Sequence, residues 1–141
     1  MWRGQPVSHL TILTGDEAGY PTGYGDTFHF ARYLSRAASI AERVTVHVGS
    51  RSRRLLQQSI TDCEFVTGLD GKARAVREAD AIVDLFFLPA AMDDRNVRPD
   101  LCLSADPDEV AAYRATFARD RLNVGVCWGS EGDYQHAKDR S

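Results

Sequence analysis

A short stretch with two glycines, an acid and two basic side chains holds the residues best suited to chemistry. Gly23 and Gly25 lead into Asp26 and Thr27, and the stretch follows an apolar run over residues 9–13. A strand, a glycine loop and a helix in this order leave free backbone N–H groups at the carboxyl edge of a sheet. Ligands bind at that edge in open α/β folds, so we expect a ligand site there.

Asp26 is the candidate general base, able to take a proton from an acceptor hydroxyl. The alternative role is a helix N-cap, in which the carboxylate accepts from backbone N–H groups. His29 lies one helical turn from Asp26, and Arg32 and Arg36 continue the same stripe of the expected helix. His29 and Arg32 could hold an anionic group of a substrate, whereas Arg36 is expected to be solvated.

Two nicotinamide-cofactor motifs match this sequence in part. The dinucleotide pattern GxGxxG fails at its third glycine, where Phe28 stands. The short-chain dehydrogenase pattern TGxxxGxG matches at Thr14, Gly15 and Gly19, with Pro21 in place of the last glycine. Arg51, Arg53 and Arg54 could then hold the 2′-phosphate of NADP, and Tyr134–Lys138 satisfies YxxxK. An NADP-dependent oxidoreductase therefore stays open as an alternative.

Short apolar runs alternate with helical patterns along the chain. Such alternation predicts an α/β fold: a single Rossmann-like three-layer sandwich with a parallel sheet. The expected strands cover residues 9–14, 44–48, 63–66, 81–85 and 122–127. The expected helices cover residues 27–43, 53–59, 72–78 and 106–118.

The helix expected over residues 106–118 has a strong start signal. Asp106 stands at the N-cap, Pro107 at the first helical position and Glu109 at the third. We expect this helix to bury Val110, Tyr113 and Phe117.

Composition narrows the class of protein. The chain has 141 residues, a net charge of -3 and 43% hydrophobic residues, which suits one soluble domain that does not bind nucleic acid. No apolar run approaches the roughly 20 residues of a membrane span. Three widely spaced cysteines (Cys63, Cys102 and Cys127) give neither a disulfide framework nor a zinc site. These features predict a cytoplasmic protein with buried, reduced thiols and no metal.

The last residues have little apolar content and follow an expected strand. We expect a Rossmann-like domain over residues 1–128 and a hinge or tail over residues 129–141, leading towards a second domain that is missing. Small residues after a strand let a phosphate approach the backbone. The candidates there are Trp128, Gly129 and Ser130, with charge from Lys138 and Arg140.

Taken together, these segments resemble the N-terminal half of glycosyltransferases of the two-domain GT-B fold. The chain is similar to the heptosyltransferase superfamily, and more specifically to the glycosyltransferase-like region behind tetratricopeptide repeats in bacterial proteins. The resemblance covers nearly the whole chain. It is carried by residues 2–4, 23–27, 30–34, 88–89, 107, 124–130 and 138–141.

The resemblance implies the acceptor side of a nucleotide-sugar-dependent glycosyltransferase. Asp26 would be the catalytic base, and Gly23, Gly25, Thr27, His29 and Arg32 would line the acceptor site. The segment from Trp128 to Arg140 would border the donor phosphates. The substrates would be a sugar acceptor and a nucleotide-diphosphate sugar, with no further cofactor. Because the donor-binding domain is missing, we expect no turnover by this chain alone.

A non-catalytic binding or interaction module of the same fold is a further alternative. A domain that has lost its partner exposes an apolar wall of its cleft, and such surfaces pair with other proteins. Self-association, or pairing with a partner domain through that wall, is the expectation under this alternative.

Overall fold

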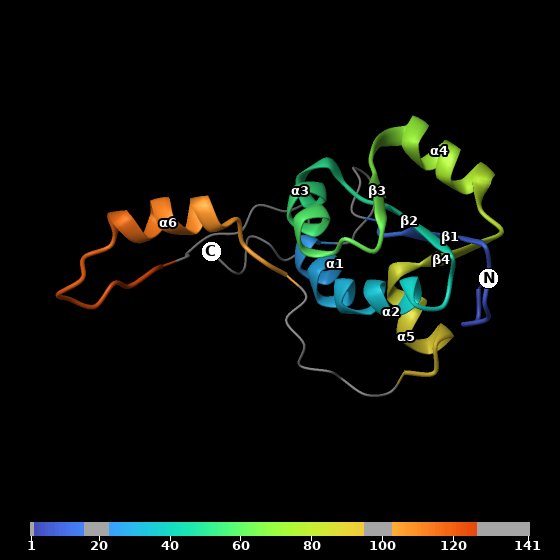
Figure 1. Ribbon diagram of the computed structural model, residues 1–141, viewed down its shortest axis with the longest axis horizontal. Helices are drawn as coiled ribbons and strands as arrows, with labels where there is room; N and C mark the ends of the chain where they lie inside the picture. The colour runs from blue at the N-terminus through green and yellow to red at the C-terminus, as the bar shows by residue number, and fades with distance from the viewer. Residues whose placement is uncertain (1, 16–22, 95–102, 127–141) are drawn as a thin grey trace, which may run out of the picture. The chain divides into compact units, whose positions relative to one another are not determined.

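The computed structural model describes residues 2–15, 23–94 and 103–126 of the chain (Figure 1). It separates into two compact units, Met1–Ala105 and Asp106–Ser141. The first unit contains a four-stranded parallel sheet in the order β3-β2-β1-β4. The strands are β1 (His9–Leu13), β2 (Arg43–His47), β3 (Glu64–Val66) and β4 (Ala81–Asp84). The α/β fold with a parallel sheet is therefore confirmed.

Helices follow each strand of the first unit. Between β1 and β2 run α1 (Tyr24–Phe30), the 3-10 turn η1 (Ala31–Tyr33) and α2 (Leu34–Ala38). The later helical elements of this unit are α3 (Ser50–Ser59), α4 (Gly68–Glu78), the 3-10 turn η2 (Leu85–Phe87) and α5 (Leu88–Ala91).

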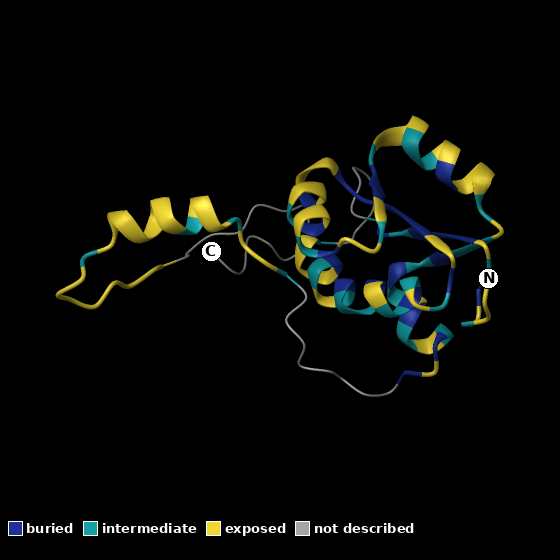
Figure 2. Ribbon diagram, viewed as in Figure 1, coloured by how far each residue is buried: buried dark blue, intermediate teal, exposed yellow. Residues whose placement is uncertain are grey.

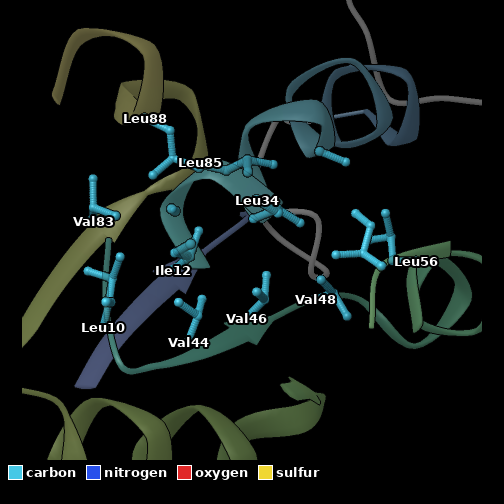
Figure 3. Packing of buried hydrophobic residues seen from close by; sticks show 14 of the residues in the cluster. Leu10, Ile12, Leu34, Val44, Val46, Val48, Leu56, Val83, Leu85 and Leu88 are labelled. Atoms are coloured by element: carbon cyan, nitrogen blue, oxygen red, sulfur yellow. The ribbon is translucent and has the colours of Figure 1, made fainter. Parts of the chain in front are cut away.

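One face of the sheet forms the apolar core. The parallel register places Leu10 beside Val44, and Ile12 beside Val46 and Val83, so these side chains share a face. Figure 3 shows them converging with Leu34 of α2, Leu56 of α3, and Leu85 and Leu88 after β4. Burial of this cluster away from water stabilises the fold.

The opposite face of the sheet is more polar and lies against α4. The Thr11 hydroxyl donates to the Ala75 carbonyl of α4 at 2.8 Å, and the Thr45 hydroxyl lies 2.9 Å from His9 Nε2. Each of these buried polar groups has a partner, so burial costs little free energy. The two faces with their helices form the three layers of a Rossmann-like sandwich.

The segment before β1 is anchored in the first unit. Trp2 is 1% exposed, and its backbone N–H donates to the Ile82 carbonyl of β4 at 3.3 Å. Gly4 has φ +82°, and a Cβ at this position would lie 2.6 Å from the Ala91 carbonyl oxygen. Only glycine fits both the backbone conformation and the space.

The helix expected over residues 27–43 differs from the observed one at both ends. It begins three residues earlier, at Tyr24, tightens to a 3-10 turn at Ala31–Tyr33 and ends at Ala38. The early start arises because Gly23, in extended conformation, is the N-cap. α3 and α4 likewise begin before their expected first residues, at Ser50 and Gly68.

The second unit contains α6 (Pro107–Thr116) with the expected N-cap. Asp106 Oδ1 accepts from the backbone N–H of Asp108 at 2.9 Å and of Glu109 at 3.3 Å. The expected burial is wrong, because α6 has no buried residue, and Tyr113 and Phe117 are 67% and 53% exposed (Figure 2).

The strand expected over residues 122–127 is not observed in its described part. Residues 122–126 form neither strand nor helix, and Leu122, Val124 and Val126 are all exposed. The alternation of apolar residues is present, but the described part of this unit, residues 106–126, contains no strand for the segment to pair with. Cys127 and the expected tail over residues 129–141 lie outside the described residues, and the predicted hinge stays a prediction.

Candidate functional site

The candidate site lies where the parallel strands of the first unit end. Leu13 of β1 is in register with His47 of β2 and with Asp84 of β4, so the three strand ends meet at one edge. The chain leaves β1 through Thr14 and Gly15 and is described again from Gly23, which caps α1. This is the edge that the glycine loop was expected to occupy.

Asp26 lies in the first turn of α1 with its side chain exposed to solvent. The N-cap alternative is wrong, because Gly23 holds that position and Asp26 is the third helical residue. A Cβ built on Gly23 would lie 3.8 Å from Asp26 Oδ2, so the carboxylate lies over the cap glycine. Within the described residues no hydrogen bond or ion pair uses this carboxylate, which leaves it available to a ligand.

Thr27 follows Asp26 and points into the protein. Thr27 is fully buried, and its Oγ1 has no hydrogen-bond partner within the described residues. A buried hydroxyl without a partner is unusual in a folded protein. The side chain therefore does not face the solvent beside Asp26, and the predicted role of Thr27 in substrate binding has no geometric support.

His29 and Arg32 are brought together on α1 and η1, as expected from their spacing. Arg32 Nε donates to the His29 carbonyl at 2.8 Å, and Arg32 Nη2 lies 3.4 Å from His29 Nδ1. Both lie on the stripe that carries Asp26, because positions three and four apart are neighbours on a helix. A carboxylate, an imidazole and a guanidinium thus line one side of α1.

Arg36 has an ion-pair partner that the sequence did not indicate. Its Nη1 forms an ion pair with the carboxylate of Asp94, whose side chain is 3% exposed. This contact ties α2 to the chain after α5, so Arg36 is a structural residue. The Arg36 side chain is 40% exposed, so the expected solvation holds in part, but nothing in the local sequence indicates a partner 58 positions away.

Aromatic packing fixes α1 against the end of β4. The rings of Phe30 and Phe86 meet edge to face with centroids 5.0 Å apart, and His29 packs against Phe30 at 5.1 Å. Asp84 Oδ1 accepts from the Phe86 backbone N–H at 3.0 Å and begins η2. These contacts give the stripe that carries Asp26 a rigid support.

Two polar residues at this edge have roles that the sequence did not indicate: Asp84 was not singled out, and Thr14 was named only in the dehydrogenase pattern. The buried Thr14 hydroxyl donates to the His47 carbonyl at 3.0 Å, which joins the ends of β1 and β2. Asp84 ends β4 and caps the next turn. Each is a polar residue directly at the end of an apolar strand, and that position is the signal that could have revealed them.

The remaining predicted site residues divide into two groups. Gly25 lies in the first turn of α1, with open space where a Cβ would be. Trp128, Gly129, Ser130, Lys138 and Arg140 lie outside the described residues, as do Tyr134, Gly19 and Pro21 of the dehydrogenase alternative. Their roles stay predictions.

Residues 2–15, 23–94 and 103–126 contain neither a cluster of metal ligands nor a membrane-spanning helix. Within these ranges no group of three or more His, Cys, Asp or Glu side chains is arranged to hold a metal ion. No helix in the same ranges is long and apolar enough to cross a bilayer.

Comparisons with known proteins do not identify a family for this chain. The scan against protein-family models, the search of curated proteins and the search of solved structures each returned no match.

Proposed function

We propose that this chain is the acceptor-side half of a nucleotide-sugar-dependent glycosyltransferase, with Asp26 as the catalytic base. The observation that carries the proposal is the exposed Asp26 carboxylate at the carboxyl edge of a parallel sheet, without a protein partner among the described residues. The resemblance to GT-B enzymes assigns the base to this position, and the sandwich fold is the one that such a half requires.

The proposed reaction moves a sugar from a nucleotide diphosphate to a hydroxyl group. Asp26 takes the proton of that hydroxyl while the hydroxyl oxygen attacks the anomeric carbon of the donor sugar. The bond from that carbon to the diphosphate oxygen breaks, and the nucleotide diphosphate leaves with the electron pair. His29 and Arg32 orient the acceptor or a phosphate group, and Lys138 and Arg140 are assigned to the leaving group's charge.

Ligand-induced thermal shifts test the class of ligand. We expect UDP-, ADP- or GDP-sugars to raise the melting temperature by mass action if the chain binds them. NADPH serves as the competing ligand, since it is the cofactor of the oxidoreductase alternative. A shift with NADPH and with no nucleotide sugar would end the glycosyltransferase proposal.

Asp26→Asn tests the base separately. In a form of the protein that turns over, the variant should lower kcat by roughly 10²–10⁴-fold, the usual contribution of a general base. The thermal shift with the donor should stay, because Asp26 is assigned to the acceptor side. Asp62→Asn, an exposed carboxylate at a different place in the first unit, is the matched control. Full turnover by Asp26→Asn would show that the role is wrong.

A second candidate function, an interaction module, is favoured by the second unit. Tyr113, Phe117, Leu122, Val124 and Val126 are all exposed there, and exposed apolar groups of this kind mark protein interfaces. Sedimentation of the intact chain and of Val124→Asp tests it. Self-association that the aspartate abolishes supports the module, whereas a monomer at all concentrations argues against pairing between copies.

A further inference from the structure

A polar hollow lies at the open edge of the sheet, and Asp26 is not among its lining residues. It has a volume of about 490 Å³ and is bounded by α3, by β3 and by α4. This volume is within the range of small-ligand sites, about 300–1,000 Å³. β3 is an edge strand of the described sheet, so no strand pairs with its outer side, and that side faces the hollow.

The floor of the hollow offers a backbone donor and a backbone acceptor. Val48 N–H donates to the Val66 carbonyl at 3.0 Å, so the backbone of Val66 faces β2. In a parallel ladder alternate residues face opposite sides, and the N–H and C=O groups of Phe65 therefore point to the open edge. Phe65 itself is only 4% exposed, which makes the floor apolar around these two groups.

Some charged side chains around the hollow are already in ion pairs, and others are not. Glu64 is already neutralised, because its two oxygens lie 2.7 Å from Arg43 Nη2 and 3.2 Å from Arg74 Nη2. The hydrogen bond from Arg43 holds the pKa of Glu64 below its usual value. Arg53 of α3 and Asp70 of α4 line the same hollow and have no ion pair within the described part of the chain.

One cation and one anion thus remain available, on two different helices and on either side of the same edge strand. The Gln57 amide and the Thr67 hydroxyl line the hollow as well, also without a partner among the described residues. A ligand that satisfies this set carries a carboxylate for Arg53, an ammonium group for Asp70 and an amide between them for Phe65.

We propose that this hollow binds a short peptide with free termini, of two or three residues. The peptide lies along β3, with its amide hydrogen-bonded to the backbone of Phe65, its carboxylate on Arg53 and its ammonium group on Asp70. The short edge strand and its charged neighbours admit no long strand, since such features normally protect a sheet edge from pairing. The site is independent of the function proposed for Asp26.

Peptide titration followed by amide NMR of the intact chain tests the proposal, with trialanine as the probe. We expect the Phe65 amide to shift, and Arg53→Gln and Asp70→Asn each to weaken binding about tenfold or more, as expected for a lost charge-assisted contact. Arg51→Gln and Glu42→Gln, exposed residues outside the hollow, are the matched controls and should bind as the wild type does.

Blocked peptides separate the two charges. N-acetylated trialanine lacks the ammonium group, so it should bind Asp70→Asn and the wild type equally weakly. C-amidated trialanine lacks the carboxylate, so it should bind Arg53→Gln and the wild type equally weakly. Two results would overturn the proposal: no shift of the Phe65 amide at millimolar trialanine, or equal affinity for the free and the doubly blocked peptide. Since all variants are on exposed side chains, unchanged circular dichroism will show that each one folds.

Discussion

The two units of this chain carry similar apolar patterns but bury them to different extents. In the first unit Leu34 and Ile12 are fully buried against one face of the sheet, whereas in the second unit Leu122 is 86% exposed. The alternation over residues 122–126 resembles that of a strand, and α6 has a complete N-terminal signal. The comparison shows that local sequence signals are enough to predict a helix such as α6. Burial of apolar side chains also requires a partner surface in the same unit.

The largest expected effect comes from the core of the first unit. Leu34→Ala should lower the free energy of unfolding by about 2–5 kcal/mol, because it leaves a cavity beneath the sheet. Leu122→Ala, the same change in the second unit, should shift it by less than about 0.5 kcal/mol. Urea unfolding followed by circular dichroism measures both. Equal losses would show that the second unit buries Leu122 in solution and would remove the contrast.

A pair of glycine substitutions should give the next largest difference. Gly4→Ala places a Cβ 2.6 Å from the Ala91 carbonyl oxygen at φ +82°, and we expect a loss of about 1–3 kcal/mol from this strain. Gly125→Ala in the second unit meets nothing within 4 Å, so it should be close to neutral. Thermal unfolding of the two variants side by side is the measurement, and a stable Gly4→Ala would mean that the segment before β1 can move away from Ala91.

The N-cap of α6 should contribute less, about 1 kcal/mol. Asp106→Ala removes two hydrogen bonds to backbone N–H groups, and α6 has no buried side chain to compensate. Amide exchange in Pro107–Thr116 should therefore quicken while the sheet stays protected. Asp120→Ala, another exposed carboxylate of this unit, is the control. Unchanged exchange in α6 would show that contacts other than the cap hold this helix.

The smallest expected effect is the pH dependence from Glu64. Its pKa is lowered in the folded protein, chiefly by the hydrogen bond from Arg43. The stabilisation is therefore fully present above the unfolded value of about 4.3 and is lost as the pH falls through the folded pKa. Both side chains are about half exposed, so the contribution is small and is screened by salt.

Urea midpoints measured between about pH 6 and pH 3 can resolve this contribution. The gap between wild type and Glu64→Gln should narrow as the solution is acidified. A gap that stays constant would indicate that the ion pair does not affect folding.

The sequence predicted the strands of the first unit and the N-cap of α6 well. The four observed strands lie within one residue of their expected bounds, and the Asp106 cap of α6 is confirmed. These signals depend on neighbouring residues only, and apolar periodicity and capping chemistry are visible in a short window.

The features that sequence reasoning could not predict depend on contacts between distant residues. Arg36 pairs with Asp94, and Trp2 is buried beside β4, although neither has a local signal of its partner. Asp26 was placed correctly at the helix start, but its exact position depended on whether Gly23 would take the cap. Its role as a base, and the roles of residues 128–140, remain predictions.

The hydrogen bond from Trp2 to Ile82 sets an order of events during synthesis. The partner of Trp2 leaves the ribosome only after 80 more residues, which at about 5–20 residues per second takes roughly 4–16 s. Until then a large indole is without its pocket, exposed to chaperones and to other nascent chains. Trp2 is thus synthesised well before the strand that completes its contacts.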